Sequence, residues 1–327
     1  MRSTGWRNQL RRVAMTAVGA AALLCLVRPA AAFPDRPITL VVPFAPGGPT
    51  DIIARILSLS LSQSLGQQVV VDNRGGAAGN IGMAQVARAT PDGHTLLLAS
   101  TAIAVNPALF KNLTYDSIKD FAPISELTTA PNVLVVHADS GINSIDDLIA
   151  RAKAEPFNYA SPGVGTKSHL TGELLKLRTG IEMVHVPFRG AGPSAQAVLA
   201  KQVQLGSVAL AAAEAMIQSG QLRALAVTSE KRWFSLPNVP TMIEVGYPGF
   251  VSDTFNALLA PAAVPQPILD TLIKESRAAF QKPDALAQAR KAGFEIVAGT
   301  PEQLSARIKS EILLVRELVA KAGIALQ

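Results

Sequence analysis

The stretch TLVVPFAPGGPTDIIARIL, residues 39–57, joins a short apolar run to a turn rich in proline and glycine, and a helical pattern follows directly. The run Ile38–Val42 is typical of a strand buried on both faces. Pro49 suits the first helical position, and apolar residues keep helical spacing until Gly66, where we expect the helix to end. The glycine turn before this helix start can hold an anion, because the first backbone N–H groups are free. Three candidates stay open: a nucleotide phosphate, a catalytic intermediate and a free acid.

The first 32 residues have the pattern of a secretory signal peptide. Arginines but no acids precede and follow an apolar run, Val13–Val27, that is shorter than the roughly 20 residues of a membrane helix. Ala30-Ala31-Ala32 then forms a cleavage site before Phe33. We therefore expect Sec-type export to the periplasm, with cleavage after Ala32. The single cysteine, Cys25, lies in this leader, so the mature chain offers no disulfide, thiol nucleophile or cysteine metal site.

The basic character of the whole chain comes from this leader. The sequence pI is near 9.6, but five of the 30 lysines and arginines lie in residues 1–32, which leaves 25 against 24 acids. A nearly neutral mature chain loses the main argument for nucleic-acid binding. The length of 327 residues suffices for two domains of about 100–200 residues each.

Strand-like and helix-like segments alternate along the mature chain. Residues 38–42, 69–73 and 94–100 are expected strands, and a second series begins at residues 132–138. Ser144, with Asp147 three residues later, predicts a helix cap. NALLAP, residues 256–261, is a further expected strand, and the remaining tail is mostly helical. Alternation with short loops predicts α/β architecture with parallel strands, in which ligands bind beyond the carboxyl ends of the strands.

Five loops that follow expected strands are rich in Gly, Ser, Thr and Asn, namely PFAPGGPTD, NRGGAAGN, STAIAVN, SPGVGTKSH and RGAGPS. Each one alone can serve simply as a tight turn. Five in one chain favour a binding cleft, because glycine lets a ligand approach the backbone and helix starts attract anions.

Motifs of the common enzyme classes are absent from these loops. GGAAGN is not a phosphate-binding P-loop, SPGVGT is not a nucleophile elbow, and APGGPTD lacks a dinucleotide fingerprint. The four histidines form no tight ligand pair, so we expect no metal site. His94 and His185 alternate with apolar residues and are interpreted as structural. His169 opens a helix, where a structural role and ligand contact both stay open.

Two charged residues in these loops allow two interpretations each. Asp51 falls in the first turn of a helix, where the dipole favours an acid. It repels an anionic ligand unless water intervenes, yet it is a natural partner for a ligand amine. Arg189 is a candidate partner for a carboxylate, or a solvated surface cation.

Long segments of the mature chain resemble one family throughout. PDRPITLVVPFAPGGPTDIIAR, VVVDNRGGAAGNIG, PDGHTLLLAS, YASPGVGTKSHLTGELLK, VHVPFRGAGPS, LRALAVTSEKR and LPNVPTMIEVGYPGF are similar to the tripartite tricarboxylate transporter substrate-binding proteins, or Bug family. The resemblance implies a type II periplasmic binding protein fold: two α/β lobes close around a ligand cleft like a Venus flytrap, with two interlobe crossings. Lobe 1 would comprise residues 33–131 plus 255–327, and lobe 2 residues 132–254.

The resemblance also implies a non-catalytic receptor that delivers its ligand to the membrane subunits of such a transporter. The ligand would be a di- or tricarboxylate, an acidic amino acid or an aromatic carboxylate, bound without cofactor, metal or nucleic acid, and we expect a monomer. The implied ligand-binding residues are Phe44, Ala45, Gly47, Gly48, Asp51, Ser100, Thr101, Ser161, Gly163, Gly165, Thr166, His169, Arg189 and Gly190.

The sequence departs from the family pattern after FRGAGPS. Ala197 and Lys201 stand where the family usually has an aspartate and glycines, and Gln204 stands where an acid is common. These changes bear on the ligand class rather than on the fold. Two alternatives remain: a ligand-binding partner of a sensor kinase, and an exported hydrolase using Ser100 or Ser161 with His169, for which no nucleophile elbow is present.

Overall fold

The opening stretch forms the first strand and helix, β1 (Ile38–Val42) and α2 (Pro49–Leu65), within the bounds that the sequence predicts. Gly66 ends α2 in the left-handed conformation, with φ of 68°. The computed structural model describes residues 33–324 and 326, so the predicted signal peptide lies outside the described residues. Residues Arg36–Gln327 form one unit of the chain, and the description below concerns this unit.

The first group of strands surrounds β1. The order is β2–β1–β3–β9–β4, with β2 at Val69–Asn73, β3 at Thr95–Ser100, β9 at Asp253–Pro261 and β4 at Phe121–His137. β1 runs parallel to β2 and β3, whereas β9 runs antiparallel to both β3 and β4. The short β10 (Glu295–Ile296) also pairs with β4.

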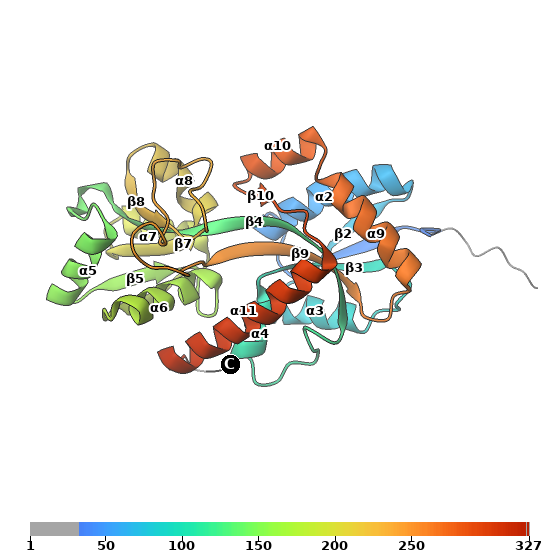
Figure 1. Cartoon of the computed structure of the whole chain (residues 1–327), viewed down its shortest axis with the longest axis horizontal. Helices are drawn as coiled ribbons and strands as arrows, with labels where there is room; N and C mark the ends of the chain where they lie inside the picture. The colour runs from blue at the N-terminus through green and yellow to red at the C-terminus, as the bar shows by residue number, and fades with distance from the viewer. Residues whose placement is uncertain (1–32, 325, 327) are drawn as a thin grey trace, which may run out of the picture. The chain divides into compact units, whose positions relative to one another are not determined.

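The second group of strands is built on the far half of β4. The order continues β4–β7–β5–β6, with β8 also paired to β4; the bounds are β5 Asn158–Ser161, β6 Val184–Pro187, β7 Leu205–Ala209 and β8 Leu222–Val227. β5 is parallel to β6 and β7. Figure 1 shows β4 and β9 running together between the two groups.

The strand β4 changes partners along its length. It pairs with β9 from Phe121 to Pro131, and with β7 and β8 from Asn132 onward. The sequence predicted only the second part as a strand, because proline normally argues against a central strand. The register with β9 shifts between Pro123 and Ser125, and such a bulge accommodates the missing N–H group of proline.

The helices pack around these strands (Figure 1). Their bounds are α3 Asn80–Ala87, α4 Ala102–Leu109, α5 Ile145–Ala154, α6 Lys167–Thr179, α7 Ala191–Leu199, α8 Leu210–Gln218, α9 Gln266–Ala279, α10 Pro283–Lys291 and α11 Pro301–Ala322, with single 3-10 turns at Ala77–Gly79 and Ala138–Ser140. The predicted Ser144 cap is present, since its side chain accepts a hydrogen bond from the Asp147 N–H group. No helix in the described part of the chain is long and apolar enough to span a membrane.

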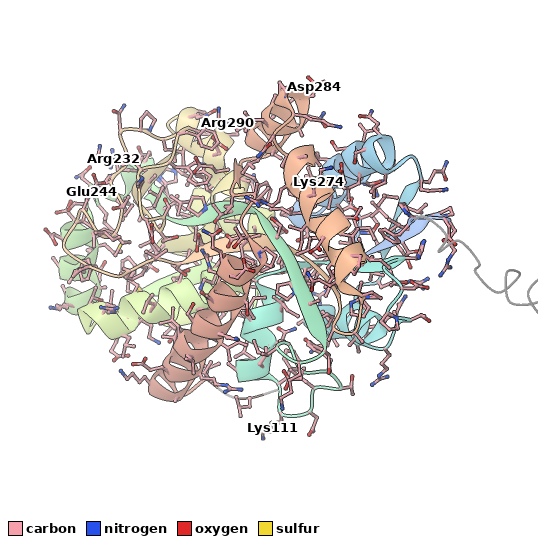
Figure 2. The ribbon with its side chains drawn as sticks, turned by 45° about the vertical axis from the view of Figure 1, so that its right-hand side comes forward. Lys111, Arg232, Glu244, Lys274, Asp284 and Arg290 are labelled. Carbon is pink, nitrogen blue, oxygen red and sulfur yellow. The ribbon has the colours of Figure 1, made fainter. Side chains whose placement is uncertain are left out.

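The long helix α11 contributes to the core of both strand groups. Its first half places Leu304 and Ile308 in a buried cluster with β1, β3 and β9. Its second half places Val315 and Leu318 in a cluster with β5, β7 and α6. Charged side chains such as Lys274 and Asp284 point outward, and Arg232 faces Glu244 with its Nε atom 3.0 Å from a carboxylate oxygen (Figure 2).

Candidate functional site

A cavity of about 270 Å³ lies where the two strand groups face each other. Residues from both groups line it: Phe44, Ala78, Ser100, Thr101, Ala102, Val105, Asn106, Leu109, Phe110, Val164, Gly165, Thr166, Lys167, Ser168 and Thr254. Five of the predicted site residues are among them, namely Phe44, Ser100, Thr101, Gly165 and Thr166. The others lie outside this lining.

One wall of the cavity is the start of α4, directly after β3. The Ser100 hydroxyl accepts a hydrogen bond from the Ala102 N–H group at 3.2 Å. Thr101 is buried, and its hydroxyl oxygen lies 3.4 Å from the Phe255 N–H nitrogen on β9. The Asn106 amide donates to the Ala78 carbonyl at 3.0 Å and to a neighbouring side-chain oxygen, which fixes the next turn of the helix.

The opposite wall is the start of α6, directly after β5. Thr166 caps this helix: its hydroxyl accepts from the His169 N–H group at 3.2 Å and donates to the Gly163 carbonyl at 2.8 Å. Gly165 adopts φ of +79°, a left-handed conformation that glycine takes without strain. The Ser168 hydroxyl donates to the Asn132 side chain at 2.5 Å, which ties the first turn of α6 to β4.

The cavity can therefore hold an anion between two helix starts. The first N–H groups of a helix have no partner within it, and the helix dipole is positive at this end. The single cation among the lining residues is Lys167, whose ammonium is paired with Glu311 of α11. Both side chains of this pair are buried. Recognition of an anion here thus depends on backbone N–H groups and hydroxyls rather than on an unpaired cation.

The loop after β1 contributes Phe44 to the lining, whereas Ala45, Gly47, Gly48 and Asp51 lie outside it. Asp51 is buried, and its carboxylate accepts from Gly47 N–H and Arg55 Nε, both at 2.9 Å, and from Asn73 Nδ2 at 3.0 Å. Burial alone would raise the pKa of Asp51, but these hydrogen bonds together lower it. Asp51 therefore holds the glycine turn before α2 in place through its hydrogen bond with Gly47. This agrees with the structural interpretation of an acid in the first helical turn.

Behind the second wall lies a polar and aromatic cluster, buried apart from the half-buried His185, that the sequence did not indicate. The Ser161 hydroxyl is 2.6 Å from His185 Nε2, and the His185 ring contacts the rings of Tyr159 and His169 at centroid distances of 4.9 and 4.1 Å. Burial, with His169 nearby, lowers the pKa of His185 to about 4. The Tyr159 hydroxyl donates to Glu173 at 2.6 Å. Ser161 and His185 are 24 positions apart in the sequence, so no local pattern indicated their hydrogen bond.

This cluster does not form the serine–histidine pair considered for a hydrolase. Ser161 is fully buried, outside the cavity lining, and its partner is His185 rather than His169. The His169 Nδ1 atom instead accepts from the Gly165 N–H group at 3.3 Å. Ser100 does line the cavity, but its hydroxyl accepts from the Ala102 N–H group and has no histidine partner among the hydrogen bonds of the described residues. These contacts assign the histidines to supporting the loop before α6.

The remaining predicted residues lie at the loop after β6. Arg189 is exposed, and Gly190, with φ of 122°, precedes α7 and accepts a hydrogen bond from Ser194 at 2.8 Å. Neither lines the cavity. Within residues 33–324 and 326, no group of histidine, cysteine and acidic side chains is arranged to hold a metal ion.

Sequence comparison identifies relatives over most of the chain. A family model described as a tripartite tricarboxylate transporter family receptor matches residues 53–324. A UPF0065 protein in the tcbD-tcbE intergenic region of Pseudomonas sp. strain P51 is 41% identical over 293 residues, covering 89% of this chain and 87% of the relative. BugT of Bordetella pertussis is 39% identical over 297 residues, covering 88% and 91%.

Solved structures agree in fold. The periplasmic binding protein BugD has a TM-score of 0.77 at 37% identity, covering 90% of this chain and 100% of BugD. A Rhodopseudomonas palustris protein solved with adipate has a TM-score of 0.79 at 33% identity, covering 90% and 100%. MatC from Rhodopseudomonas palustris, solved with malate, has a TM-score of 0.75 at 31% identity, covering 88% of this chain and 100% of MatC.

These likenesses confirm two of the predictions. The fold is the type II periplasmic binding protein fold, with two α/β lobes, a cleft between them and two crossings. The matching family consists of receptors, which confirms a binding protein in place of an enzyme. On the match over residues 53–324 and on the relatives that share most of its length, the chain belongs to the tripartite tricarboxylate transporter receptor family, which includes the Bug proteins.

Proposed function

We propose that this protein binds a small organic carboxylate in the cavity between α4 and α6 and delivers it to the membrane subunits of a tripartite tricarboxylate-type transporter. The proposal rests on one observation above all: two helix starts, at Thr101 and Thr166, line the same cavity. Each start presents a positive dipole end and hydroxyls to an anion, together with first-turn N–H groups that have no partner within the helix. The relatives solved with adipate and malate support a carboxylate as that anion.

The proposed lobes are residues 33–131 plus 255–327 and residues 132–254. The exchange of strand partners on β4, from β9 at Pro131 to β7 at Asn132, supports the first boundary. We further propose that the leader, residues 1–32, directs the chain to the periplasm. The protein would act there as a monomer. We propose that the ligand contacts the residues that line the cavity, and that Asp51 and His169 hold the loops of this lining in place.

The test is a thermal-shift screen of the protein, unfolded and refolded to remove any bound ligand, against dicarboxylates, tricarboxylates, acidic amino acids and aromatic acids. A ligand at 100 times its dissociation constant stabilises by about 2.7 kcal/mol, which raises the melting temperature by a few degrees. A shift for one acid class supports the proposal. No shift for any acid in the screen contradicts it.

A matched pair of variants tests the position of the carboxylate. Ala102→Asp adds a negative charge at the first position of α4, inside the cavity, and we expect it to abolish the shift by repulsion. Ala191→Asp adds the same charge at the first position of α7, outside the cavity, and should leave the shift unchanged. Retention of the full shift in Ala102→Asp would place the carboxylate elsewhere.

A further inference from the structure

The cavity is polar at one end and apolar at the other. Its polar end lies against the crossing strands, because Thr101 contacts β9 at Phe255, next to Thr254, and Ser168 contacts β4 at Asn132. Ser100 and the first turns of both helices belong to this end. Hydroxyls and helix N–H groups are thus gathered on one side of the ligand space.

The apolar end lies further along α4. Val105, Leu109 and Phe110 line the cavity on successive turns of this helix and just after it. Leu109 meets the loop before α6, since a Cβ atom added to Gly165 would stand 2.8 Å from its Cδ1 atom. Val164, which is 49% exposed, completes this end beside Gly165.

The side-chain nitrogen donors among the lining residues, those of Lys167 and Asn106, already have partners. The Lys167 ammonium is paired with Glu311, and the Asn106 amide donates to the Ala78 carbonyl and to Asn80. A second carboxylate placed against Val105 and Leu109 would be desolvated without a donor among the lining residues. Burying an ionised carboxylate without a partner is strongly unfavourable.

We infer that the ligand is a monocarboxylate with a compact apolar body, an alkyl chain or an aromatic ring, rather than a di- or tricarboxylate. This inference rests on the proposed function. The single carboxylate lies at the starts of α4 and α6, and the apolar body fills the space between Val105, Leu109, Phe110 and Val164. The apolar end of the cavity therefore determines which class of carboxylate the site binds.

Calorimetric titration of the exported protein with matched acids tests this inference. Hexanoate and adipate differ in the second carboxylate, as do benzoate and terephthalate. We expect the monoacid of at least one pair to bind about tenfold more tightly, or better, than its diacid, because a partnerless polar group costs at least this much. A diacid that binds more tightly than its monoacid in both pairs would overturn the inference and leave the proposed function standing. No binding of any of the four acids would overturn the inference, whereas the proposed function would fall only if the wider thermal-shift screen also gave no shift.

A cation added at the apolar end should reverse the preference. Val164→Arg places a guanidinium at an exposed position of this end, and we expect the ratio of diacid to monoacid affinity to rise about tenfold or more. Leu177→Arg is the control, because Leu177 is similarly exposed, at 43%, but lies on α6 outside the cavity lining. An unchanged ratio in Val164→Arg would overturn the placement of the apolar body.

Discussion

Gly165 packs closely against Leu109 of α4 at the cavity. A methyl group there would meet Leu109 at 2.8 Å, and the backbone φ of +79° disfavours any other residue. Gly180, at the end of α6, has φ of +69° but open space around it. Both glycines thus adopt the left-handed backbone conformation, but only at Gly165 would an added methyl group meet a neighbouring side chain.

Gly165→Ala should weaken ligand binding, because the added methyl group holds the α6 loop away from α4. Gly180→Ala should leave binding unchanged. Both variants should lose about 1 kcal/mol or more of unfolding free energy from left-handed strain. Calorimetric titration and thermal unfolding measure the two effects separately. Equal ligand affinities in both variants would show that the Leu109 contact does not limit binding.

His185 gives the protein a pH dependence in the mildly acidic range. Its pKa is lowered to about 4 by burial and by His169, whereas an unfolded histidine titrates near 6.5. On acidification the unfolded chain therefore takes up this proton first. The stability that the neutral ring contributes is complete above about pH 6.5 and is lost as the pH falls towards about 4.

His185→Gln should flatten this part of the stability profile, because glutamine can still hydrogen bond to Ser161 but does not titrate. One group contributes at most about 1.4 kcal/mol per pH unit. Urea unfolding at several pH values between about 4 and 7 measures the slope. His169, whose pKa burial also lowers, accounts for part of the remaining slope. A variant that keeps the whole wild-type slope would disprove the assignment to His185.

At the scale of elements, α11 forms two ion pairs with neighbouring elements, one buried and one half-buried. Glu311 of α11 pairs with Lys167 of α6, and Arg307 pairs with Asp253 of β9 at 2.6 Å. Removing one member of a buried pair leaves the other charge without a partner, which is costly. An exposed pair on the same helix, Lys321 with Glu317 at 2.6 Å, offers the comparison.

Glu311→Gln should lower the free energy of unfolding by about 3–5 kcal/mol, because Lys167 stays buried and unpaired. Glu317→Gln should have little effect, because water screens the exposed pair with Lys321. The double variant Lys167→Met with Glu311→Leu should recover most of the loss. Chemical denaturation measures all three. Similar losses for Glu311→Gln and Glu317→Gln would mean that the Lys167 pair is effectively solvated.

The sequence predicted elements well where local pattern and packing agree. Ile38–Val42 and Val69–Asn73 form strands with the expected bounds, and Gly66 and Ser144 bound their helices as expected. It missed the first half of β4, because pairing with β9, which is distant in sequence, overrides the two prolines in that segment. Local pattern carries no record of such long-range pairing.

Part of the cavity lining could be predicted from the sequence. Strand-end loops identified Ser100, Thr101, Gly165 and Thr166, because parallel strands bring their carboxyl ends together. The apolar residues Val105, Leu109 and Phe110 were missed, since apolar spacing on a helix is read first as core. These residues line a cavity only because the loop before α6 lies opposite them, and a local sequence pattern does not show such a long-range contact.

At the scale of the whole molecule, the two lobes should close on a ligand. Both crossings are strands, β4 and β9, and the cavity draws its walls from both sides of them. Small-angle scattering should show a smaller radius of gyration with a confirmed ligand than without it. An acid that gives no thermal shift is the control. An unchanged radius with the confirmed ligand would count against closure.

The place of β9 also affects how the chain is made. β9 lies between β3 and β4, so that Leu97 pairs with Leu259, although the whole second lobe separates them in sequence. The first sheet therefore cannot be completed until synthesis has passed Pro261, the last residue of β9. Pairing of such distant segments slows folding. For a chain predicted to cross a membrane unfolded, this delay keeps the nascent protein competent for export.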